Sequence, residues 1–122
     1  MFVLLFAACV GNPVLDPDTR GCTDYDFDDP AKPALKKEAE DGGVAVFRTP
    51  VERPNLDDSF EPEIVTDGAT IEVHEAWVDG ADGQASCLEP VLHISEFGAP
   101  IEVRWFTDAD TSIPFDTLTV SP

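Results

Sequence analysis

Residues 70–78 read TIEVHEAWV, and the alternation of side chains in this stretch decides the fold class. In an extended chain, Ile71, Val73 and Trp77 fall on one face. Glu72 and His74 fall on the opposite face. A period of two, with β-branched residues on one side, is typical of a strand that buries one face against a core. We therefore predict a half-buried strand here.

The same pattern recurs in both directions along residues 44–122. Further strands are predicted at 44–48 (VAVFR), 63–66 (EIVT), 87–95 (CLEPVLHIS), 100–107 (PIEVRWFT) and 115–120 (FDTLTV). Turn signals such as Asp79-Gly80 separate these strands, and no helical pattern interrupts them. We predict an all-β domain, an antiparallel β-sandwich of immunoglobulin-like or fibronectin-like type with six or seven strands. We expect Trp77 and Trp105 in its core, and Pro90 at an edge strand or a bulge.

The segment that precedes this domain has a different composition. Residues 9–43 are rich in proline and acidic side chains and lack apolar periodicity, so we predict a disordered acidic tether. Within it, Ala34 to Glu40 contains good helix formers and is compatible with a short helical turn. The expected organisation is therefore residues 1–8, a tether at 9–43 and a β-sandwich at 44–122.

Net charge limits the classes of partner. The chain has 122 residues with 25 acidic and 7 basic side chains, which gives a formal net charge of −18. Such a surface repels the phosphates of nucleic acids, so we expect no nucleic-acid binding. Divalent cations and a protein with a basic surface remain as possible partners. Adaptation to salty surroundings would explain the same acidity without a partner.

The first residues have the character of an export signal. Phe2 to Ala8 is far shorter than the roughly 20 apolar residues that span a bilayer. Its length suits the apolar region of a signal, so residues 1–8 are predicted to be the remnant of a signal peptide. The stretch Leu5-Phe6-Ala7-Ala8-Cys9 resembles the lipobox of bacterial lipoproteins. The resemblance implies that Cys9 becomes the first mature residue and carries diacylglycerol on its sulfur.

This resemblance implies a location and a role for the cysteines. The protein would lie in the cell envelope, attached to the membrane through Cys9 and facing the periplasm or the exterior. If Cys9 carries lipid, Cys22 and Cys87 remain, and an oxidising compartment would let them form a disulfide. The alternative is that Cys22 and Cys87 are two unrelated thiols.

Two groups of aspartates suggest calcium ligands. Asp16, Asp18 and Asp24 occupy positions 1, 3 and 9 of a loop of EF-hand type, but two of its other ligand positions hold side chains without a suitable oxygen. Asp108, Asp110 and the later Asp116 resemble half of a cation-binding loop. In both places a solvated polar segment explains the same residues.

The two histidines suggest a different metal. His74 and His93 lie on outward faces of predicted strands and could share a transition metal if those strands are neighbours. No histidine or cysteine spacing typical of a metal site supports this, and we expect no cofactor, with Ca²⁺ as the alternative.

Three functional hypotheses follow. The first is a lipid-anchored surface module with a binding or structural role and no catalytic activity, since the chain has no nucleophile motif and no glycine-rich phosphate loop. The second is a metal-binding protein or metal-dependent enzyme. The third is a cytoplasmic acidic protein of a salt-accumulating organism, in which the apolar N-terminus belongs to the core and Cys22 and Cys87 are free thiols.

Overall fold

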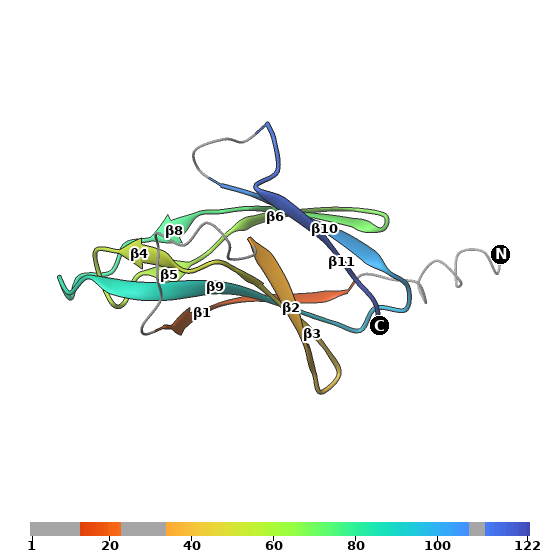
Figure 1. The fold of residues 1–122 in the computed structure, drawn as a ribbon, viewed down its shortest axis with the longest axis horizontal. Helices are drawn as coiled ribbons and strands as arrows, with labels where there is room; N and C mark the ends of the chain where they lie inside the picture. The colour runs from red at the N-terminus through yellow and green to blue at the C-terminus, as the bar shows by residue number, and fades with distance from the viewer. Residues whose placement is uncertain (1–12, 23–33, 108–111) are drawn as a thin grey trace.

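The computed structural model describes residues 13–22, 34–107 and 112–122, and these form strands without any helix (Figure 1). The all-β prediction is therefore confirmed. The strands are β1 (Val14–Gly21), β2 (Leu35–Glu40), β3 (Gly43–Arg48), β4 (Val51–Arg53), β5 (Ser59–Phe60), β6 (Glu63–Asp67), β7 (Thr70–His74), β8 (Trp77–Val78), β9 (Ser86–Ser95), β10 (Ile101–Phe106) and β11 (Asp116–Val120).

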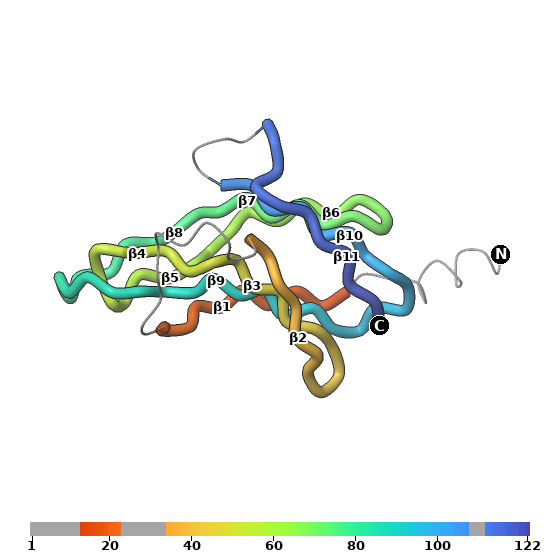
Figure 2. The backbone as a smooth tube through the Cα atoms, in the orientation of Figure 1, coloured from red at the N-terminus to blue at the C-terminus, as the bar shows by residue number. Residues whose placement is uncertain are grey.

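Two larger sheets pack together as a β-sandwich, as Figure 2 shows in the same orientation. One sheet has the order β1-β9-β3-β2, with β4 also paired to β9. The other sheet has the order β11-β10-β7-β6, and a short pair, β5 and β8, forms a third ladder. The structure has more strands than the six or seven expected, because β1 and β2 are additional and β4, β5 and β8 are short pieces.

The core lies between the inward faces of the two large sheets. Its fully or almost fully buried side chains come from both sheets, which is the arrangement that a sandwich requires, with Phe60 added from β5. They include Leu35, Val44, Val46, Phe60, Ile71, Val73, Leu92, Ile94, Ile101, Val103, Trp105 and Val120. The alternation seen in the sequence is therefore the alternation between this core and the outer faces.

The 70–78 stretch forms two strands instead of one. Strand β7 ends at His74, and β8 begins at Trp77 and pairs with β5 through Phe60. Trp105 is fully buried, as expected, but Trp77 is only half-buried at the margin of the core. Its ring lies 5.6 Å from that of Phe60.

The predicted tether is wrong for two of its stretches. Residues 14–21 form β1, which pairs along its length with β9, and residues 35–40 form β2, which pairs with β3. Local composition favours disorder in both stretches, but pairing with a strongly apolar strand, the distant β9 for β1 and the adjacent β3 for β2, supplies the hydrogen bonds and packing that these residues lack by themselves. The remaining tether residues, 9–12 and 23–33, lie outside the described residues.

The short helical turn with which 34–40 is compatible does not form, because 35–40 is strand β2. A two-residue turn, Asp41-Gly42, reverses the chain so that Glu40 pairs with Gly43, and Gly42 has a positive φ of 85°. Asp-Gly is a favoured pair in such tight hairpin turns. Helix propensity is a weak preference that tertiary pairing overrides, and Leu35 gains burial in the core by this pairing.

Two details of the sheets differ from the sequence-based expectation. Strand β10 runs parallel to β7, whereas the other pairs are antiparallel. Strand β9 is central, so of the two alternatives expected for Pro90, an edge strand or a bulge, the edge strand is wrong. Pairing of β9 with β3 ends at Val91 and pairing with β4 begins at Leu88, so Pro90 lies opposite the gap between the two partners. A residue without an N–H group is tolerated where a ladder is interrupted.

The expected disulfide is present between Cys22 and Cys87. It links the end of β1 to the start of β9, where the Cys22 N–H also donates to the Cys87 carbonyl at 3.1 Å. The two cysteines are 65 residues apart in the chain. The bridge therefore fixes an edge strand to the central strand of its sheet.

Candidate functional site

The structure brings together two of the predicted metal-ligand groups that the sequence keeps apart. His93 lies on the outer face of the five-stranded sheet, where Asp16 is its partner in the β1–β9 pairing. Its Nδ1 is 2.7 Å from a carboxylate oxygen of Glu40, and its Nε2 is 3.8 Å from one of Asp18. When it is protonated, the imidazole would therefore form ion pairs with carboxylates from both edge strands, β1 and β2.

His74 lies elsewhere. It belongs to β7 in the four-stranded sheet, so the strands of the two histidines are not neighbours and the condition for a shared metal site is not met. His74 instead stacks on Phe106 with ring centroids 4.5 Å apart, and its Nε2 is 3.3 Å from Glu72.

The aspartates considered as calcium ligands do not assemble in the described part of the chain. Asp116 accepts a hydrogen bond at 3.0 Å from the backbone N–H of Leu35, which links the two sheets. Asp24, Asp108 and Asp110 lie outside the described residues. Among residues 13–22, 34–107 and 112–122, no group of three or more His, Cys, Asp or Glu side chains is arranged to hold a metal ion.

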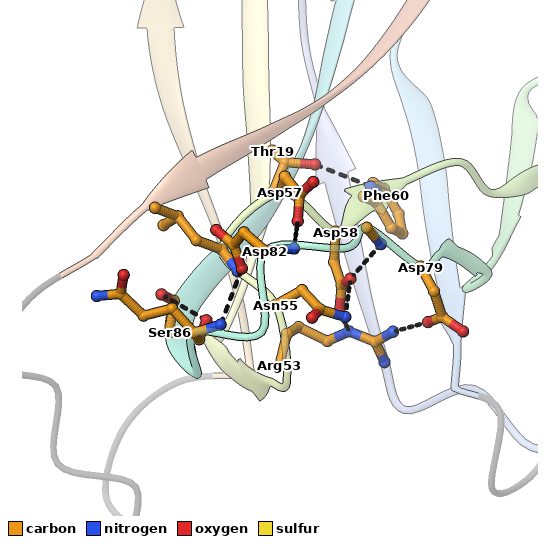
Figure 3. Close-up of polar contacts among 12 residues, drawn as sticks. Thr19, Arg53, Asn55, Asp57, Asp58, Phe60, Asp79, Asp82 and Ser86 are labelled. Atoms are coloured by element: carbon orange, nitrogen blue, oxygen red, sulfur yellow. Dashed lines mark hydrogen bonds and ion pairs between the residues drawn. The ribbon is translucent and has the colours of Figure 1, made fainter.

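The densest polar cluster connects two loops that the sequence analysis did not single out (Figure 3). The Asp58 side chain is buried, and it accepts hydrogen bonds from Gly80 N at 2.6 Å, Asn55 Nδ2 at 3.1 Å and Arg53 Nε at 3.0 Å. Arg53 also pairs with Asp79 at 3.1 Å. The cluster fixes the 53–60 segment against the 78–83 segment.

Asp57 completes this connection from the same loop. Its carboxylate accepts from the backbone N–H groups of Ala81 at 3.0 Å and Asp82 at 3.2 Å. A Cβ atom at Gly80 would lie 2.0 Å from the Asp57 carboxylate, so a larger residue at this position would displace that carboxylate from its present place. The carboxylates of Asp57 and Asp58 both accept hydrogen bonds from the protein, so the role of this cluster is to hold the two loops together.

The side-chain pKa values of Asp57 and Asp58 are both lowered in the folded protein. The hydrogen bond from Gly80 holds the pKa of Asp58 below its ordinary value of 3.8, and the bond from Ala81 does the same for the pKa of Asp57. A carboxylate with a lowered folded-state pKa stabilises the fold above its unfolded-state pKa, and this stability is lost as pH falls through the folded-state value.

We therefore expect the wild-type protein to lose stability below about pH 4 more steeply than a D57N/D58N variant. Urea unfolding at pH 7 and pH 3 measures the difference, and the comparison cancels the change in overall charge repulsion that both proteins share. Equal losses in the two proteins would show that these carboxylates do not contribute.

A second polar cluster lies inside the sandwich. Glu75 follows β7 and pairs with Arg48 Nε at the end of β3, so the ion pair joins the two sheets. Their side chains are only 6% and 13% exposed. Trp105 Nε1 donates to the same Glu75 oxygen at 2.7 Å, and the ring of Phe115 lies 4.7 Å from the Arg48 guanidinium.

All four arginines form ion pairs with carboxylates of the same chain. The pairs are Arg20–Glu89, Arg48–Glu75, Arg53–Asp58 with Asp79, and Arg104–Glu102. Because these cations are already paired, the remaining acidic side chains give the surface its negative charge.

Comparison with known proteins does not add a function: no protein family model, curated protein or solved structure matches the chain. Within residues 13–22, 34–107 and 112–122, no helix is long and apolar enough to cross a membrane. The function is therefore inferred from the residues themselves.

Proposed function

We propose that the protein is an exported, lipid-anchored module of the cell envelope that acts as a non-catalytic binding or structural β-sandwich. The observation that carries the proposal is the cysteine arrangement. The chain has three cysteines, and Cys22 pairs with Cys87. Cys9 is the third, and it stands at the end of the stretch that resembles a lipobox.

The disulfide also supports export. Disulfides persist in oxidising compartments and are rare in the cytosol, where thiols are kept reduced. A cytoplasmic protein of a salt-accumulating organism would be expected to keep Cys22 and Cys87 as free thiols. The acidic surface fits either location, but the paired cysteines favour the envelope.

The lipid anchor also makes physical sense for this domain. Each buried lipid CH₂ group contributes roughly 0.8 kcal/mol, so two or more acyl chains hold a domain firmly at a membrane. Anionic lipid headgroups repel an acidic surface, so the sandwich would project away from the membrane and present its surface to other molecules. We propose that it works without a bound cofactor.

Labelling the native host with radioactive palmitate tests the anchor. We expect label in the wild-type protein and none in a Cys9→Ser variant, because the serine offers no sulfur for diacylglycerol. A C22S/C87S variant is the matched control, since it removes two other thiols and should keep the label. Label that persists in Cys9→Ser, or a wild-type protein without label, would contradict the anchor.

A further inference from the structure

The terminal strands of the two large sheets differ in how their outer edges are covered. Strands β2 and β11 meet through Lys37 Nζ, which donates to the Thr119 carbonyl at 2.8 Å. Strand β1 meets β5, where the Phe60 N–H donates to Thr19 Oγ1 at 2.9 Å (Figure 3). Strand β6 ends the four-stranded sheet, and in the described part of the chain no comparable hydrogen bond reaches it from outside that sheet.

An uncovered terminal strand presents unpaired backbone groups that can accept another strand. The hairpin of β6 and β7 is visible at the margin of the molecule in Figure 2. On its outer face, β6 exposes Glu63, Val65 and Asp67, and Val65 is 44% exposed. Ile64, on the opposite face, packs against the core, which fixes the register of these exposed residues.

The charge of this edge is strongly one-sided. Residues 54–103 contain no lysine or arginine, so the whole β6–β7 hairpin lacks a basic side chain except for His74. Its acidic residues are Glu63, Asp67 and Glu72, and Glu72 lies directly across from Val65. An acidic–apolar–acidic row therefore lies beside an open line of backbone groups.

We propose that the open edge of β6 binds an extended segment of a partner protein in which every second residue, along one face of the strand, is basic, apolar and basic in turn. Main-chain hydrogen bonds would add the segment as a further strand. On the outer face, its basic side chains would lie opposite Glu63 and Asp67, and an apolar side chain would lie against Val65, since directly opposed side chains interact across strands.

A second copy of this chain fits the edge poorly. Two antiparallel β6 strands related by a two-fold axis at Val65 would place Glu63 of one copy opposite Asp67 of the other. Like charges directly opposite each other are destabilising, and each copy also carries a net charge of −18. The chemistry of this edge therefore selects a basic partner.

The proposal deepens the proposed function, because it presupposes a binding module and names the partner's chemistry. The test uses the full chain and a capped nine-residue peptide, called the alternating peptide, whose third, fifth and seventh residues are lysine, valine and lysine and whose other residues are threonine, because residues two apart lie on the same face of a strand. Calorimetric titration compares it with a peptide of the same composition whose lysines form one block, and with one that carries proline at the centre. We expect the alternating peptide to bind at least about tenfold more tightly than either control, because only it matches both the side-chain row and the backbone ladder.

Charge variants locate the site. We expect E63K/D67K to weaken binding of the alternating peptide by about tenfold or more. The matched control, E38K/E52K, makes the same change in net charge at exposed positions of β2 and β4, and should change binding by less than about threefold. Bound peptide should also slow hydrogen exchange of backbone amides within 63–67.

Three results would overturn the proposal. The block peptide could bind as tightly as the alternating peptide. E38K/E52K could weaken binding as much as E63K/D67K does. The bound peptide could leave the hydrogen exchange of the β6 amides unchanged. Each of them would indicate diffuse attraction to an acidic surface. None bears on the palmitate labelling, so failure of this docking site is distinguishable from failure of the lipid anchor.

Discussion

Removal of the Cys22–Cys87 disulfide is expected to lower the free energy of unfolding by about 4 kcal/mol. The bridge joins residues 65 apart, so the unfolded chain gains much conformational freedom when it is absent. In the folded state the disulfide matters most for β1, which is an edge strand. The inward face of β1 contributes only one large apolar side chain, Leu15, to the packing. Urea unfolding of a C22A/C87A variant measures the effect.

Chemical reduction of the wild-type protein is the control, and it should reproduce the loss seen in the variant. Hydrogen exchange should show faster opening of β1 than of β9 once the bridge is gone. A loss below about 1 kcal/mol would mean that the β1–β9 pairing holds the edge strand without help from the disulfide.

Glu75→Gln is expected to lower the free energy of unfolding by about 3–5 kcal/mol. The substitution keeps the size of the side chain and leaves an oxygen that can accept from Trp105. It removes the negative charge, however, so Arg48 becomes a buried cation without its counter-ion. An uncompensated buried charge is the costly consequence of breaking such a pair. Urea unfolding at pH 7 gives the measurement.

Glu102→Gln is the matched control, because it breaks the Arg104–Glu102 pair, in which both side chains are about two-fifths exposed. Solvent screens such pairs, so the expected loss is below about 1 kcal/mol. Removing the arginine as well, as in R48M/E75Q, is expected to recover most of the loss, because no buried cation remains and the glutamine oxygen still accepts from Trp105. Equal small losses in Glu75→Gln and Glu102→Gln would show that the burial of the ion pair has no energetic consequence.

The strands with clear alternation were predictable because one face meets the core along their whole length. In the 101–106 strand, Ile101, Val103 and Trp105 are all buried, as their spacing indicates. Glu75 was not predicted to be buried, although it lies at the next position of the series Ile71, Val73 that faces the core. A carboxylate in that series was a signal for a buried partner, although its identity, Arg48, depends on how the sheets pack.

The two strands in the expected tether were harder to predict. In β1 the side chains that face inward are Leu15, Pro17 and Thr19, which give little apolar contrast with the acidic residues between them. For β2 a signal was present in Asp41-Gly42, which is a strong hairpin indication when extended segments flank it. The flanking LKKEAE sequence lacks β-branched residues, so local propensity concealed the hairpin.

The polar clusters depend on contacts between residues distant in sequence. Asp58 and Gly80 are 22 residues apart, and His93 and Glu40 are 53 residues apart. Sequence spacing could indicate turns at Asp79-Gly80 and Asp82-Gly83, but not which carboxylates those turns would bind. For the same reason, the grouping of His93 with Asp16 and Asp18 required the β1–β9 register.

The central claim is that the chain is an exported lipoprotein, and its most direct test is the intact mass of protein from the native host before and after reduction. We predict a chain that begins at Cys9, carries acyl groups and gains two hydrogen atoms on reduction of Cys22–Cys87. An unmodified chain that begins at Met1 and has three free thiols would contradict both the anchor and the envelope location.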